Sequence, residues 1–191
     1  MTRTMRIRLL LLALAAAITA TALLLVAGGN QPAHGASDPA AVTQAQSLAA
    51  EPNLDRRAAP AYSGGEQARA AAARFAERVP LPDGGNLNGI QWEAAGGVFS
   101  APEVETVIEA NAVCQWLRAL RDRRGESAAR RVLDAAPGWP GLRDQDGFTA
   151  SVVADVRAGG GERLEAALRD CDDAHEREVA YAKQMGLAPS A

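Results

Sequence analysis

The sequence has few of the residues that usually carry chemistry or build a large aromatic core. Among 191 residues there are two cysteines, two histidines, eight aromatic residues (3 Trp, 2 Tyr and 3 Phe) and one lysine, Lys183. This composition excludes a disulfide-dense scaffold, a collagen-like chain and low-complexity disorder. Ile and Asn are scarce together with lysine, as in a GC-rich coding sequence. We therefore give the excess of arginine over lysine no functional weight.

The chain also lacks a strong positive charge and the common catalytic motifs. Its formal net charge is −3, and about −6 once the basic first 36 residues are set aside. Nucleic-acid binding draws most of its affinity from neutralising phosphates, so we expect no nucleic-acid partner. The sequence contains no Gly-x-Ser-x-Gly and no glycine-rich segment with phosphate-binding spacing between a strand and a helix. We accordingly expect no cofactor.

A long hydrophobic run does occur, at the N-terminus. Arg3, Arg6 and Arg8 precede the apolar residues 9–27. Basic residues before such a run keep the N-terminus inside, so the rest of the chain is predicted to be exported. Residues 1–36 are then either an uncleaved signal anchor or a signal peptide cut near Gly35/Ala36. The 19 residues of the run are enough to span a bilayer, which favours the anchor.

Two further regions follow the leader. Residues 37–65 are rich in Ala, Pro, Gln and Ser and have few large apolar side chains. Such a stretch buries too little surface to offset its ordering entropy, so it is predicted to be a flexible linker. Residues 66–191 show helical periodicity and form the predicted exported domain.

Helices are predicted at residues 66–79, 101–124, 126–136, 148–158 and 162–185. The clearest start is at Ser100, where Ser100 and Glu103 fit a capping box and Pro102 stands in the first turn. Glycines and prolines crowd residues 81–97, which indicates an ordered loop that could hold a short pair of strands. The pattern predicts an all-α domain with four to five helices around one core.

The two cysteines lie on inward faces of different predicted helices. In an oxidising compartment Cys114 and Cys171 are expected to form a disulfide. Two alternatives use their neighbours: a zinc site made with His175 and Glu178, or a Cys171–His175 pair of nucleophile and base. Closely spaced cysteine pairs, usual in zinc sites, are absent. The disulfide is therefore the preferred interpretation.

Three sets of residues are candidates for binding. Asn111, Gln115 and Arg118 line up along the polar flank of the helix that follows Ser100. Trp139 stands between two prolines, where an exposed indole would be a strong contact. Arg123 and Arg124 could meet an anionic surface. Each set also has a plain structural interpretation: a solvated face, a lid on the core, and ion pairs with the acidic last helix.

The preferred function is a non-enzymatic binding or accessory role at the cell surface, for a membrane-tethered or secreted helical domain. Its partner would be an unknown protein or an anionic envelope component. One alternative is a metal-dependent or Cys/His hydrolase that uses Cys171, His175 and nearby acids. Another is a structural envelope protein whose role is its own assembly.

Overall fold

A computed structural model describes residues 38–54, 59–93, 98–143, 145 and 147–191 of the chain. All of them belong to the second of two compact units, which runs from Ala33 to Ala191. The predicted leader 1–36, its apolar run 9–27 and the predicted cut near Gly35/Ala36 lie outside the described residues. Within the ranges that are described, no helix combines the length and the apolar character needed to cross a bilayer.

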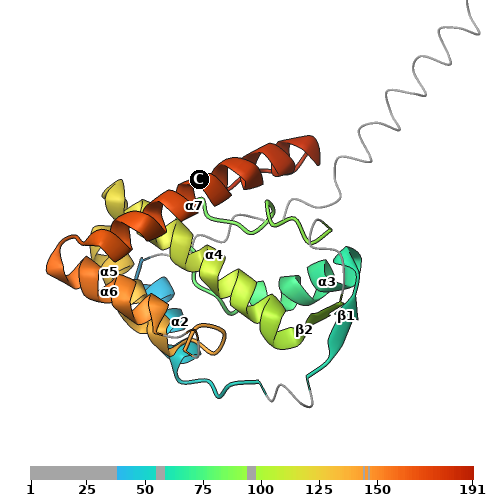
Figure 1. Cartoon of the computed structure of the whole chain (residues 1–191), viewed down its shortest axis with the longest axis horizontal. Helices are drawn as coiled ribbons and strands as arrows, with labels where there is room; N and C mark the ends of the chain where they lie inside the picture. The colour runs from blue at the N-terminus through green and yellow to red at the C-terminus, as the bar shows by residue number, and fades with distance from the viewer. Residues whose placement is uncertain (1–37, 55–58, 94–97, 144, 146) are drawn as a thin grey trace, which may run out of the picture. The chain divides into compact units, whose positions relative to one another are not determined.

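The described chain is all-α apart from one pair of short strands (Figure 1). Six α-helices and a 3₁₀ turn account for most of it. In chain order they are α2 (Asp38–Ala49), α3 (Gly65–Ala76), α4 (Ala101–Arg121), α5 (Glu126–Ala135), η1 (Ala136–Gly138), α6 (Phe148–Ala158) and α7 (Glu162–Gln184). The predicted fold class is confirmed. The extra helix relative to the expected four to five is α2.

Helix α4 is central and packs against α3, α5 and α7. It begins where the sequence predicts. The backbone N–H of Ser100 donates to Glu103 Oε2 over 2.6 Å, and the N–H of Glu103 donates back to Ser100 Oγ over 3.4 Å. This reciprocal pair satisfies two N–H groups that have no partner within the helix. Local sequence alone therefore sets the start of the helix that organises the fold.

The last three helices also end close to their predicted limits, because glycines separate them. Gly125 and Gly147 precede α5 and α6 in the left-handed conformation, with φ of 56° and 71°. Gly159, with φ of 85°, ends α6. A residue with a Cβ is strained at such angles, so each glycine allows a sharp change of direction.

The prediction of a flexible linker at residues 37–65 is wrong for the first half of that range. Residues 38–49 form α2, which packs against α5 and η1. Ala41, Ala45 and Leu48 are almost fully buried. They recur at steps of four and three, so they share one helix face. The expectation failed because it rested on the scarcity of large apolar side chains, and two of these three buried residues are alanines.

The two strands lie outside residues 81–97, the loop for which the sequence left a strand pair open. β1 (Ala61–Ser63) pairs antiparallel with β2 (Val98–Ser100), with Tyr62 opposite Phe99. Residues 81–93, the described part of that loop, contain turns and no strand. The strand pair thus joins the two ends of the segment that contains α3.

The core is built from small aliphatic residues and three tryptophans. Trp116 Nε1 donates to the carbonyl of Pro80 over 2.9 Å, and Trp139 Nε1 donates to that of Ala45 over 3.1 Å. Trp92 packs edge-to-face against Phe99, with ring centroids 5.9 Å apart. A buried indole N–H needs an acceptor, and here two indoles use it to fix a loop and a helix to the core.

We predict that Leu48→Ala lowers the free energy of unfolding by about 2–5 kcal/mol, the usual range for a leucine removed from a packed core. Gln46→Ala, at an exposed position of the same helix, is the control and is expected to change stability by under about 0.5 kcal/mol. Urea unfolding followed by circular dichroism measures both. Equal stabilities for the two variants would show that α2 is not part of the core.

Candidate functional site

A polar pocket of about 280 Å³ lies between α4 and α7. The predicted binding row and the predicted cysteine and histidine residues meet here, although they are far apart in sequence. The lining residues are Ile90, Val107, Ala110, Asn111, Cys114, Gln115, Arg118, Cys171, Ala174, His175 and Glu178. We refer to this cavity as the polar pocket, after the polar side chains of Asn111, Gln115 and Arg118 in its lining; most of the surface that it exposes is apolar.

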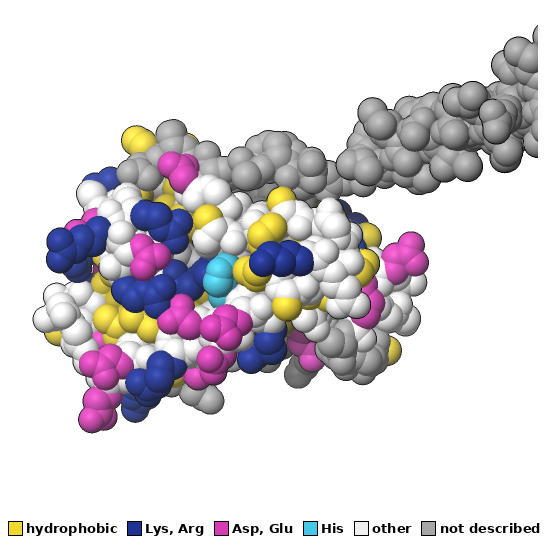
Figure 2. All heavy atoms as spheres, turned by 90° about the horizontal axis from the view of Figure 1, so that it is seen from above, with side chains coloured by type: hydrophobic (Ala, Val, Ile, Leu, Met, Phe, Trp, Pro, Cys, Tyr) yellow, Lys and Arg dark blue, Asp and Glu magenta, His cyan; other side chains and the backbone are white. Residues whose placement is uncertain are grey.

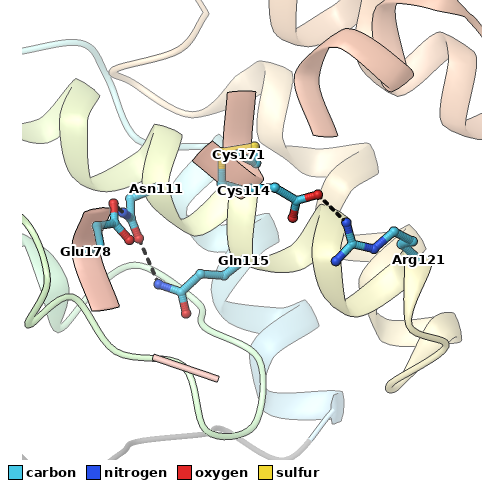
Figure 3. Close-up of a disulfide and its surroundings, with 7 residues drawn as sticks. Asn111, Cys114, Gln115, Arg121, Cys171 and Glu178 are labelled. Carbon is cyan, nitrogen blue, oxygen red and sulfur yellow. Dashed lines mark hydrogen bonds and ion pairs between the residues drawn. A yellow bond between two sulfur atoms is a disulfide. The ribbon is translucent and has the colours of Figure 1, made fainter. Parts of the chain in front are cut away.

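The predicted disulfide is confirmed, and it lines the polar pocket. Cys114 on α4 and Cys171 on α7 are bonded, with 5.2 Å between their Cα atoms (Figure 3). That separation lies within the usual range for a disulfide. The cysteines are 57 positions apart, so the bond fixes the last long helix to the central one.

The bond removes the sulfur atoms from the two alternative chemistries. The described residues include no free cysteine, so Cys171 offers neither a thiolate nucleophile nor a zinc ligand in this state. Nor do they contain a group of three or more His, Cys, Asp or Glu side chains placed to hold a metal. The zinc site that was considered from Cys114, Cys171, His175 and Glu178 is therefore wrong.

A chain of hydrogen bonds runs along one wall of the polar pocket (Figure 3). Asn111 Nδ2 donates to Glu178 Oε1 over 2.5 Å. Gln115 Nε2 donates to Asn111 Oδ1 over 2.8 Å and to the carbonyl oxygen of Asn86 over 2.7 Å. Gln115 is 2% exposed. Its Oε1 is buried and has no partner in the described part of the chain.

Arg118 supplies a matching unpaired donor. The residue is 4% exposed, and its Nη2 donates to the carbonyl oxygen of Ala191 over 3.1 Å. Its Nε is buried and finds no acceptor among the described residues. A buried polar atom left without a hydrogen bond costs about 1–3 kcal/mol. Two side chains that line the polar pocket thus each carry one unsatisfied buried atom, a donor on Arg118 and an acceptor on Gln115.

Burial and one cation set the protonation of the acidic and basic groups. Burial raises the pKa of Glu178, and the charge of Arg118 opposes that rise. Burial, with the charge of Arg118 as the next contribution, lowers the pKa of His175 below its usual 6.5. The His175 imidazole is therefore neutral at pH 7, and Arg118 is the permanent cation of the polar pocket.

Residues 188–191 contact two members of the polar pocket's lining and are held mostly through their backbone. The side chains that contact them are Asn86, Asn88, Arg118 and His175. The contacts are Asn86 Nδ2 to Pro189 O (2.9 Å), Asn88 Nδ2 to Ala188 O (3.1 Å), Arg118 Nη2 to Ala191 O (3.1 Å), Ala191 N to Gly84 O (3.2 Å) and Ser190 Oγ with His175 Nδ1 (3.3 Å). These bonds fix one Arg118 nitrogen, Nη2, and leave Nε without a partner among the described residues.

Trp139 was a candidate for binding through an exposed indole, and the structure contradicts that exposure. Its exposed fraction is 0%, and its indole N–H is bonded to the carbonyl of Ala45. The prediction assumed that flanking prolines hold the indole outward. Instead residues 137–141 turn the ring inward, because α2 provides a covered surface and an acceptor.

Arg123 and Arg124 are exposed, as predicted, in the turn after α4. They lie outside the polar pocket. Arg124 Nη2 lies 3.5 Å from Asp122, and Arg121 makes a 2.6 Å ion pair with Asp172 on α7. On the face shown in Figure 2, basic and acidic side chains are interspersed. Arg121 therefore pairs with the acidic last helix, and Arg124 pairs with an acid in its own turn.

Two buried carboxyl groups on α4 were missed. Glu105 is 3% exposed, and Arg78 Nη2 donates to its Oε1 over 3.1 Å. Glu109 is 0% exposed; its Oε2 accepts from the Gly141 N–H over 2.8 Å, and its Oε1 is unpartnered in the described structure. Their spacing of four places them on the same face as the buried Ile108 and Ala112, which was the available signal.

Burial, reinforced by the neighbouring Glu105, raises the pKa of Glu109 to about 8. Glu109 is therefore protonated at neutral pH. It is not part of the polar pocket's lining. Its hydrogen bond with the Gly141 N–H holds that backbone against α4.

The chain matches no protein-family model, no curated protein and no solved structure.

We predict that the Cys114→Ser/Cys171→Ser pair lowers the free energy of unfolding by about 4 kcal/mol, from the loop entropy of a 57-residue closure. Urea unfolding of the oxidised protein and of the variant measures the difference. Reduction of the unaltered protein is the matched comparison and is expected to give a loss of the same size. A variant as stable as the oxidised protein would contradict the role given to the bond.

We predict that Glu109→Gln flattens the pH dependence of stability. The pKa of Glu109 is about 8 in the folded state, above the ordinary glutamate value of 4.5. The folded state therefore retains the proton that the unfolded state releases. The contribution of Glu109 to the free energy of unfolding is therefore fully present below pH 4.5. It decreases as the pH rises from 4.5 to 8, by no more than about 1.4 kcal/mol per pH unit. The glutamine has no proton to lose.

Urea unfolding at pH 5, 6, 7 and 8 tests the sign of this effect, with the exposed Glu165→Gln as control. Glu105 and Glu178, whose pKa values are also raised, leave a residual slope in the variant. A slope equal to that of the control would show that Glu109 does not titrate as its burial requires.

Proposed function

We propose that this chain is a non-enzymatic binding domain that acts outside the cell membrane, tethered or released, and that its ligand enters the polar pocket. One observation carries the proposal. Gln115 Oε1 and Arg118 Nε are buried, lack partners in the described chain and belong to side chains that line the same cavity. A ligand that pairs with both removes two unsatisfied groups from the folded protein.

These two atoms limit the chemistry of the ligand. Arg118 Nε needs an acceptor, and Gln115 Oε1 needs a donor. The permanent cation of Arg118 and the neutral His175 favour an acceptor with negative character. A polar segment of a partner protein, whose peptide groups offer both donor and acceptor, meets these requirements, and we propose it as the ligand.

Two observations support the location outside the membrane. Arg3, Arg6 and Arg8 precede the apolar run 9–27, the arrangement that directs the following chain across a membrane. The disulfide between Cys114 and Cys171 fits an oxidising compartment. The hydrolase alternative loses its nucleophile to the same bond. No contact in the described structure specifically favours a self-assembling envelope protein.

We predict that Ala174→Phe reduces capture of the partner by at least about tenfold. Ala174 lines the polar pocket from α7, so a phenyl ring there occupies the cavity without removing a hydrogen bond. Ala180→Phe, the same substitution at an exposed position of the same helix, is the control. Crosslinking on intact cells that express each tagged full-length variant, followed by quantitative mass spectrometry, measures the recovery.

The two variants separate the possible outcomes. Loss of a specific protein with Ala174→Phe alone supports the polar pocket as the binding site. Equal recovery of all proteins from both variants contradicts it. Recovery of the chain's own copies alone would favour the structural envelope role.

A further inference from the structure

A second and larger cavity, of about 430 Å³, lies between α4, α6 and α7. Its wall is mainly aliphatic. Val113, Leu117, Leu142, Val152, Val153 and Ala167 all contribute. Cys114 and Cys171 line this cavity as well as the polar pocket, so the disulfide lies between the two. We refer to it as the apolar pocket.

The size and lining of the apolar pocket suit a small apolar group. Pockets that bind small ligands commonly measure 300–1,000 Å³ and are mostly apolar, with few polar groups. Phe148, at the start of α6, lines the cavity and is 48% exposed. A slender hydrocarbon chain inside would remove apolar surface from water, and Phe148 would cover the part that emerges.

One charged residue defines the polar end. Asp170 on α7 is the only charged side chain of the lining; the other polar members are Thr106, Gln145 and Thr149. Asp170 is exposed and forms no ion pair with any residue that the structure describes. A hydrocarbon that carries a positive charge at its end would place that charge near the Asp170 carboxylate.

We propose that the apolar pocket binds the hydrocarbon chain of a cationic amphiphile, with the cation beside Asp170. The site is separate from the polar pocket and takes a different class of ligand. It uses no residue on which the proposed function depends except the shared disulfide and Ala110.

Two probes of equal chain length and opposite charge test the proposal. Decylammonium and decanoate, each below its micelle concentration, are titrated into the oxidised full-length protein and followed by calorimetry. Decylammonium is expected to bind about fivefold more tightly, the ratio that one exposed ion pair supplies. Asp170→Asn is expected to remove this preference. The polar-pocket variant Ala174→Phe should bind decylammonium as the unaltered protein does.

Val153→Phe is expected to fill the apolar pocket and reduce binding of both probes by at least about tenfold. Should that variant fail to fold, Phe148→Ala tests the same cavity from its half-exposed edge and is expected to weaken both probes.

Three results would overturn the proposal. In the first, neither probe binds. In the second, both probes bind equally well and Asp170→Asn changes neither affinity. In the third, Val153→Phe or Phe148→Ala leaves the affinities unchanged. The second result would indicate a neutral apolar ligand, and the third would indicate adsorption elsewhere on the surface.

Discussion

The covalent link between α4 and α7 is the constraint on which the remainder of this fold depends. Helix α7 is 23 residues long, yet only Ala167, Cys171 and Ala182 are buried in it. Leu164 and Leu168 add partly buried contacts with the core, so packing gives this helix a modest attachment for its length. The Cys114–Cys171 bond attaches its middle directly to the central helix. Both cavities occur where these two helices meet.

Helix α4 serves two environments, and its sequence shows the division. One face carries Val104, Ile108 and Ala112 into the core, together with the buried acids Glu105 and Glu109. The flank toward α7 carries Asn111, Gln115 and Arg118. The acids on the core side contact Arg78 and the Gly141 backbone, and one oxygen of Glu109 stays unpaired there as well. The polar groups toward α7 leave a donor and an acceptor unpaired, which is why we place ligand binding there.

Local signals predicted the helices that have them. The Ser100–Glu103 capping box and the glycines around α5 and α6 act within a few residues, so the sequence shows them directly. The core role of α2 depends instead on what its alanines contact. An alanine-rich sequence is compatible with both a solvated linker and a tight helix interface. Only the contacts of α2 with α5 and η1 show that here it forms an interface.

The candidate site divides in the same way. The pairing of Cys114 with Cys171 and the alignment of Asn111, Gln115 and Arg118 follow from helical spacing, which the sequence contains. The burial of Trp139 and of Glu109 does not, because each depends on a distant backbone group. These are the Ala45 carbonyl for the indole and the Gly141 N–H for the carboxyl. Sequence shows which residues share a face, and tertiary contacts decide which face is covered.

Two contacts between α4 and α7 hold the wall of the polar pocket in place. The disulfide bond fixes Cys171 against Cys114, and the hydrogen bond from Asn111 fixes Glu178 about two turns further along α7. Under the proposed function, a ligand would meet side chains that are already held in position. Such preorganisation lowers the ordering cost of binding, and it requires the oxidised chain.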